Sequence, residues 1–101
     1  MYYNNIGDGL ILLGKYKEAK FFLKRALLTK DTLVYAQALN NYAKAKFLDD
    51  KTYNPLSELN KALQLRKDKK SIEGQNSSFS TLADFYLDKD PEKEKKIAST
   101  W

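Results

Sequence analysis

Apolar residues recur along this chain with the spacing of one face of an α-helix, and polar residues fill the positions between them. The first set with the i, i+3, i+4, i+7 spacing of a helix that buries one face comprises Tyr3, Ile6, Gly7 and Leu10. No segment shows the strict alternation of a half-buried strand. The pattern predicts an all-α chain of about six helices, over residues 2–13, 16–29, 33–48, 55–67, 72–88 and 91–101.

Turn and capping residues support these boundaries. They occur in four pairs, Gly14-Lys15, Asp31-Thr32, Asn54-Pro55 and Asp90-Pro91. Proline fits the first turn of a helix, and Asn or Asp before it can cap the free N–H groups there. We therefore expect the fourth and sixth helices to begin at these prolines, and either Asp31 or Thr32 to cap the third.

The helical pattern itself repeats along the chain. The first copy contains Tyr3, Ile6, Gly7, Ala26 and Leu27. After about 36 residues, the second contains Leu39, Tyr42, Ala43, Ala62 and Leu63, and a partial third contains Phe79, Leu82, Ala83 and Tyr86. Small residues recur at equivalent places, where they would let two helices approach closely. A repeat of this length indicates stacked helix pairs, and such arrays usually bind other proteins.

This pattern resembles the tetratricopeptide repeat (TPR), and the resemblance covers nearly the whole chain. It is carried in the first copy by Tyr3, Ile6-Gly7, Leu10, Tyr16, Ala19, Leu23 and Ala26, and in the second by Leu39, Tyr42-Ala43, Leu59 and Ala62. The third copy matches at Phe79, Leu82-Ala83 and Tyr86. The resemblance implies a right-handed superhelix of antiparallel helix pairs, an α-solenoid, in one domain over 1–101. Its repeats would cover about 1–31, 32–70 and 71–101, the last incomplete.

Two residues depart from the TPR pattern. Lys46 stands where a large apolar residue is expected, so we expect Phe47 to fill that space. Pro55 takes the place that Ala19 has in the first copy, which predicts a late start for the fourth helix. Because the chain begins inside a repeat helix, we also expect a piece of a longer array, or a homo-oligomer that covers its end helices.

The resemblance implies that the first helix of each pair lines a concave groove. The candidate ligand-binding positions on those helices are Asn4, Asn5, Asp8, Asn40, Asn41, Lys44, Ser80, Thr81 and Asp84. Asparagine amides both donate and accept, so they could hold an extended peptide backbone. The alternative is that these amides satisfy nearby backbone groups. The two interpretations are balanced for Asn5 and Asn41, and the structural one is favoured for Asn4.

Composition limits the chemistry. The chain has no Cys and no His, and its acidic pairs lack the spacing of a calcium loop, so we predict no metal, no cofactor and no catalytic residue. Eighteen Lys and Arg against 13 Asp and Glu leave a net charge of +5. A solvated basic surface explains this excess better than nucleic-acid binding through the lysine-rich turns.

The sequence therefore predicts a noncatalytic scaffold that binds a protein or peptide in its groove. The alternative function is a sensory or regulatory segment of a larger bacterial signal-transduction protein, either a histidine kinase or a transcriptional regulator, because the spacing is also similar to that of longer bacterial TPRs. No signal-peptide pattern or membrane-spanning apolar run is visible, which favours the cytoplasm, with a periplasmic sensor segment as the other possibility.

Overall fold

Five α-helices make up the described part of the protein. The structure is a computed structural model and describes residues 2–89. Its helices are α1 (Tyr2–Leu12), α2 (Tyr16–Ala26), α3 (Thr32–Asp49), α4 (Leu56–Asp68) and α5 (Ile72–Lys89). Residues 2–89 contain no strand, so the predicted all-α class is confirmed for them. The sixth helix predicted from Pro91 lies outside the described residues.

The capping residues act largely as the sequence predicts. The carboxylate of Asp31 accepts hydrogen bonds from the backbone N–H groups of Leu33 (2.9 Å) and Val34 (3.0 Å), so Asp31 is the N-cap of α3. Asn54 accepts from the N–H of Leu56 at 3.0 Å, but α4 begins at Leu56, one residue later than the expected start at the proline, so its N-cap is Pro55 and not Asn54 as predicted. Both side chains satisfy N–H groups that have no partner within the helix.

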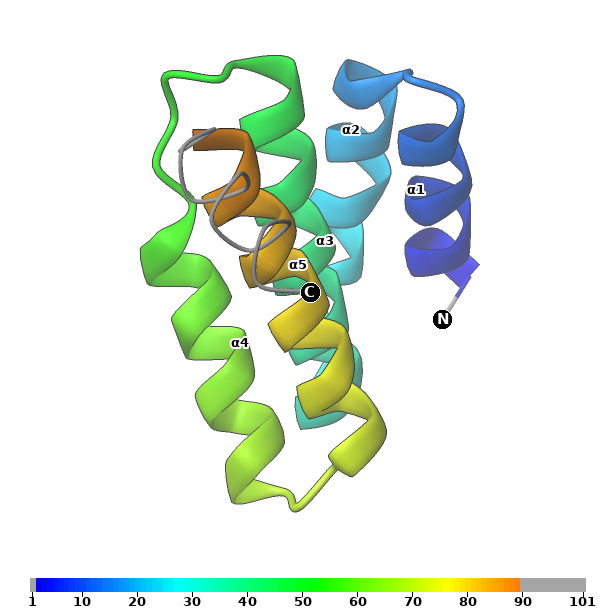
Figure 1. Cartoon of the computed structure of the whole chain (residues 1–101). Coiled ribbons are helices and arrows are strands. Elements are labelled where there is room, and N and C mark those ends of the chain that lie inside the picture. The colour runs from blue at the N-terminus through cyan, green and yellow to red at the C-terminus, as the bar shows by residue number, and fades with distance from the viewer. Residues whose placement is uncertain (1, 90–101) are drawn as a thin grey trace.

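Consecutive helices run in opposite directions and pack against each other (Figure 1). In Figure 1, α4 stands at the left and α1 at the right, with α3 between them and α5 in front of α3. Helix α3 also contacts both α1 and α5, whereas α2 and α4 do not contact each other within residues 2–89. Thus α3 is the central helix, and α1, α3 and α5, which run in the same direction, border one side of the molecule.

Two apolar clusters form the core. The first comprises Ile11, Ala19, Leu23 and Ala45, and the second Ala36, Leu39 and Ala62. The predicted small residues in both helix pairs are buried: Gly7, Ala19, Ala26, Ala43 and Ala62. At Gly7 the approach is so close that an added β-carbon would lie 2.4 Å from Cγ of Leu23. The small residues of the first two copies therefore do lie where helices meet.

The expected core face of α5 is wrong. The residues of this helix that are buried are Ser78, Thr81 and Phe85, whereas Phe79 (49% exposed), Ala83 and Tyr86 (43%) are exposed and Leu82 is half-buried. Among the described elements α5 contacts only α3 and α4, and these helices meet its Ser78–Phe85 face. The rings of Phe85 and Phe47 meet edge to face with centroids 4.9 Å apart.

The environment of Lys46 also differs from the expectation. Phe47 turns to Phe85 of α5 and does not fill the space at Lys46. Instead, Lys46 packs its ammonium over the rings of Tyr42 (4.6 Å) and Tyr53 (4.5 Å). Its charge is neutralised by Glu58, whose carboxylate lies 3.0 Å away. A charged side chain thus takes the apolar position because aromatic faces and a carboxylate surround it.

Four tyrosines lie on the core faces that the sequence predicts: Tyr3, Tyr16, Tyr42 and Tyr86. Two of them, Tyr3 and Tyr86, are exposed in the structure. Tyr16 and Tyr42 are half-buried against the Leu23 cluster, as expected. Tyr3 is 38% exposed and stacks on Phe22 of α2. The side chain of Tyr86 on α5 is 43% exposed.

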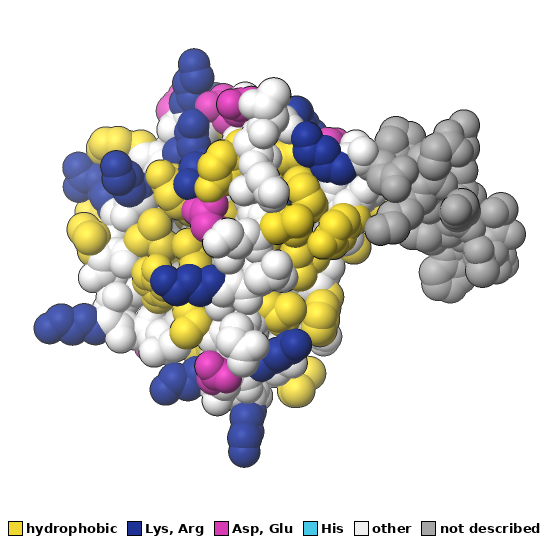
Figure 2. Space-filling view, turned by 90° about the vertical axis from the view of Figure 1, so that its left-hand side faces the viewer, with side chains coloured by type: hydrophobic (Ala, Val, Ile, Leu, Met, Phe, Trp, Pro, Cys, Tyr) yellow, Lys and Arg dark blue, Asp and Glu magenta, His cyan; other side chains and the backbone are white. Residues whose placement is uncertain are grey.

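Charged side chains are spread over the surface. Figure 2 looks onto the side of the molecule where α4 lies, and shows hydrophobic side chains in patches separated by polar ones. Lys and Arg side chains project around its outline. None of the helices in residues 2–89 is at once long and apolar enough to cross a membrane.

Candidate functional site

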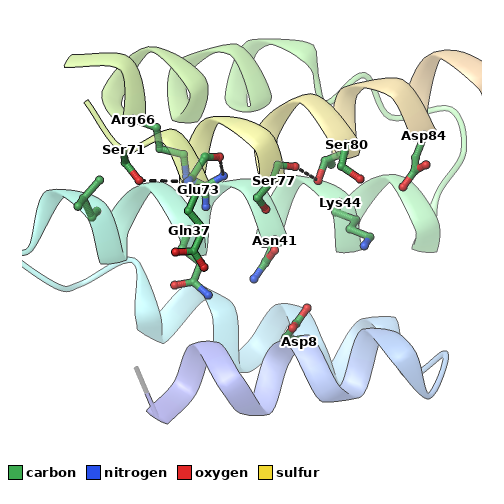
Figure 3. A pocket seen from close by; sticks show the side chains of 13 residues that line it. Asp8, Gln37, Asn41, Lys44, Arg66, Ser71, Glu73, Ser77, Ser80 and Asp84 are labelled. Carbon is green, nitrogen blue, oxygen red and sulfur yellow. Dashed lines mark hydrogen bonds between the residues drawn. The ribbon is translucent and has the colours of Figure 1, made fainter. Parts of the chain in front are cut away.

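A cavity of about 470 Å³ opens between α1, α3 and α5 (Figure 3). Six of the nine candidate residues line it: Asp8 from α1, Asn41 and Lys44 from α3, and Ser80, Thr81 and Asp84 from α5. They come from three helices that are distant in sequence, and they gather because α1 and α5 both pack on α3. The volume falls within the range of small-molecule and side-chain binding pockets.

The other three candidate residues do not line the cavity. Asn4 is fully buried, and its amide donates to the carbonyl oxygen of Val34 at 3.5 Å. Asn40 is also buried and donates to Oγ1 of Thr81 at 3.0 Å. Asn5 is exposed on α1. Asn4 and Asn40 thus contact neighbouring helices, and neither lines the cavity.

Asn41 both contacts a neighbouring helix and lines the cavity. Its amide nitrogen donates to Oδ1 of Asn4 at 3.4 Å, which links α3 to α1. Its side chain also lines the cavity and in Figure 3 points towards the side of Asp8. A donor and an acceptor of this amide remain for a ligand, since the contact with Asn4 uses one of its two N–H groups.

Seven further residues line the cavity and were not identified from the sequence as candidates: Leu33, Gln37, Arg66, Ser71, Glu73, Gly74 and Ser77. Most lie at the end where α4 passes into α5, a junction that sequence repeats describe poorly. In the sequence, Gly74 is a signal of close packing at this junction, because glycine near the start of a helix is unfavourable unless close packing requires it.

At Gly74 the requirement comes from Arg66. A β-carbon at residue 74 would lie 2.9 Å from Cδ of Arg66 and 2.8 Å from Oγ of Ser71. Because residue 74 is glycine, the arginine stem passes directly against the backbone of α5. Nη1 of Arg66 then donates to the carbonyl oxygen of Gly74 and to Oγ of Ser78, both at 2.9 Å.

The cavity carries charges of both signs. The acids are Asp8, Glu73 and Asp84, and the bases are Lys44 and Arg66. In the described part of the chain, none of these five forms an ion pair within 4.0 Å. Arg66 is only 4% exposed, and its burial lowers the pKa of the guanidinium. The charges are therefore available to a ligand.

A second, smaller cavity of about 160 Å³ adjoins the first. The two share Lys44, Thr81 and Asp84. The remaining wall of the smaller cavity is mainly apolar and includes Phe47, Leu48, Pro55, Leu59 and Phe85. The site thus combines a polar cavity with an apolar recess at one end.

This arrangement can hold a ligand through hydrogen bonds and charges. Amides and hydroxyls from α3 and α5 provide donors and acceptors suited to a peptide backbone. In residues 2–89 no three acidic side chains gather as a metal ion would need. Comparison with protein-family models, with curated proteins and with solved structures finds no match in any of the three.

Proposed function

We propose that this protein is a noncatalytic scaffold of the TPR-like, α-solenoid type that binds an extended segment of a partner protein or peptide. The ligand would lie in the cavity between α1, α3 and α5. The observation that carries the proposal is the gathering of Asp8, Asn41, Lys44, Ser80, Thr81 and Asp84 around one cavity. The repeat pattern predicts these six as groove positions, together with Asn4, Asn5 and Asn40, which do not line the cavity.

The lining supports a peptide as the ligand. A peptide backbone offers donors and acceptors at regular spacing, and Asn41, Ser80 and Thr81 offer both kinds of group in return. The recess beside Lys44 and Asp84 would accept an apolar side chain of the same segment. A ligand with both features fits this site better than a uniformly charged one such as nucleic acid.

The packing of the first two helix pairs also supports a repeat scaffold. Gly7 and Ala43 occupy equivalent positions in α1 and α3, and both are buried. Each helix contacts its neighbours in sequence, as expected when one helix pair stacks on the next. In such a scaffold the first helices of successive pairs form a common surface, and here these are α1, α3 and α5.

The proposal can be tested with two pools of random short peptides, both acetylated at the N-terminus, one amidated at the C-terminus and the other with a free C-terminal carboxylate. The immobilised full chain should enrich a set of sequences, and a selected peptide should bind in solution. In the variant Ser80→Trp, the indole would fill the cavity and weaken binding of that peptide at least about tenfold, which corresponds to about 1.4 kcal/mol.

Asn76→Trp is the matched control. Asn76 is exposed on the same helix and does not line the cavity. Binding should be retained in this variant, and thermal unfolding should show that both variants are folded. Failure to enrich any peptide, or equal binding by folded Ser80→Trp, would contradict the proposed function.

A further inference from the structure

We propose that Arg66 is an anchor for a carboxylate group of the bound segment. This inference rests on the proposed function, because it names the chemistry that the cavity recognises. Arg66 belongs to α4, but its side chain reaches the cavity between α1, α3 and α5 (Figure 3). The repeat pattern assigned no ligand contact to α4.

The hydrogen bonds of Arg66 leave part of its guanidinium unused. Nη1 donates its two hydrogens to the carbonyl oxygen of Gly74 and to the hydroxyl oxygen of Ser78. The guanidinium has five N–H donors, so the three on Nε and Nη2 remain. One N–H from each of these nitrogens forms the planar fork that binds the two oxygens of a carboxylate.

The charge of Arg66 is not neutralised within the described chain. Buried arginines are usually paired with an acid, because an unpaired buried charge is unfavourable. The two acceptors here, Gly74 and Ser78, are neutral, and no carboxylate of residues 2–89 lies within 4.0 Å. Glu73 lines the same cavity but is exposed. An incoming carboxylate would supply the missing negative charge.

The surrounding charges favour a carboxylate over a phosphate. Three acids line the cavity, Asp8, Glu73 and Asp84, against the two bases Lys44 and Arg66. A phosphate carries nearly two negative charges at neutral pH and would be repelled more strongly than a carboxylate, which carries one. The carboxylate could belong to an Asp or Glu side chain or to a C-terminus, and these two sources need separate probes.

Nuclear magnetic resonance of the full-length protein tests the anchor directly. The Nε–H signal of Arg66, assigned by its loss in Arg66→Lys, should shift saturably with N-acetyl-aspartate N-methylamide, which mimics an internal acidic residue. N-acetyl-alanine tests a terminal carboxylate, and N-acetyl-asparagine N-methylamide is the uncharged control. No shift with either carboxylate, or an equal shift with the control, would overturn the inference. So would tighter binding of inorganic phosphate.

Two substitutions should change carboxylate affinity in opposite directions. Arg66→Met removes the fork. The affinity for whichever carboxylate probe shifts the Nε–H signal should fall by roughly 10-fold to 100-fold, the range for a charge-assisted hydrogen bond. Lys67→Met removes the same charge from an exposed neighbour that does not line the cavity, and should have little effect. Glu73→Gln removes an acid beside the site and should strengthen binding.

The outcomes separate this inference from the proposed function. If random peptides bind in the cavity without enrichment of acidic residues, and Glu73→Gln leaves carboxylate affinity unchanged, the anchor is wrong and the scaffold stands. If the carboxylate probes bind at Arg66 but no peptide binds, Arg66 is a carboxylate-binding residue and the peptide scaffold is wrong. Glu73→Gln keeps the test decisive even if Arg66→Met fails to fold.

Discussion

Cγ of Leu23 lies 2.4 Å from the place that a β-carbon on Gly7 would occupy, so α1 and α2 can approach this closely only with glycine at position 7. Gly7→Ala should therefore overpack the α1–α2 crossing and lower the free energy of unfolding by about 1–2 kcal/mol. Gly9→Ala is the matched control, because nothing lies within 4 Å of a β-carbon there. It should stabilise α1 by up to about 1 kcal/mol. Urea unfolding of both variants measures the difference, and destabilisation by both would contradict the assigned packing.

Asn4 and Asn5 are adjacent in sequence but should respond differently to alanine. Asn4 is buried and connects Val34 and Asn41 through its amide, whereas Asn5 is exposed. Asn4→Ala should lower the free energy of unfolding by about 1–3 kcal/mol, because it leaves the partly buried carbonyl of Val34 and amide of Asn41 without their partner. Asn5→Ala should stay within about 0.5 kcal/mol of the wild type. Thermal unfolding checks both, and equal stabilities would show that the Asn4 contacts do not hold α1 on α3.

The buried pair Asn40 and Thr81 offers a test between α3 and α5. The Asn40 amide donates to Thr81 Oγ1, while Oδ1 of Asn40 has no hydrogen-bond partner in the described structure. Thr81→Val would leave both ends of the amide unsatisfied and should cost about 1–3 kcal/mol.

The reciprocal substitution, Asn40→Leu, should cost much less. It removes the unsatisfied oxygen, and the Thr81 hydroxyl keeps its bond to the Ser77 carbonyl at 3.2 Å. The double variant Asn40→Leu with Thr81→Val should be close to Asn40→Leu in stability. A double-mutant cycle measures this coupling, and simple additivity of the two effects would refute it.

The Lys46–Glu58–Tyr53 network predicts a loss of stability at alkaline pH. Burial lowers the pKa of Lys46, but hydrogen bonds and charge interactions with Tyr53 and Glu58 outweigh burial and raise it overall. Burial, followed by the hydrogen bond to Glu58, raises the pKa of Tyr53. Both folded-state pKa values exceed the unfolded ones, so both contributions are complete below about pH 10 and are lost as the pH rises through the folded values.

Glu58→Gln should reduce these contributions. We expect a loss of about 1 kcal/mol at neutral pH, since the pair is only half-buried, and a shallower fall in stability above about pH 10. Asp88→Asn is the control. It breaks the ion pair between Asp88 and Lys51 (2.8 Å), which is more exposed than the pair between Lys46 and Glu58. Urea midpoints across the alkaline range measure the effect. A fall as steep as in the wild type would mean that Glu58 does not raise the two pKa values.

Much of the fold could be predicted because its signals are local. Asp31 caps α3 through groups two and three residues away, and the glycine at 14 adopts a φ of +76° in the turn where the sequence predicts one. The burial of Gly7 and Ala43 followed from periodicity alone. The face of α5 could not be predicted in this way, since its burial depends on which helices pack against it.

The candidate site, like the fold, could be predicted only in part from local sequence signals. From the sequence alone one could determine that residues 2–89 are helical, where their helices begin and end within a few residues, and which helices carry the polar positions now found around the cavity. Only the tertiary structure decided that Asn4 and Asn40 are buried between helices while Asn41 lines the cavity, and that Arg66 of α4 reaches it. The physical reason is that capping and periodicity act over a few residues. Burial and unpaired charge depend instead on contacts between helices that are distant in sequence.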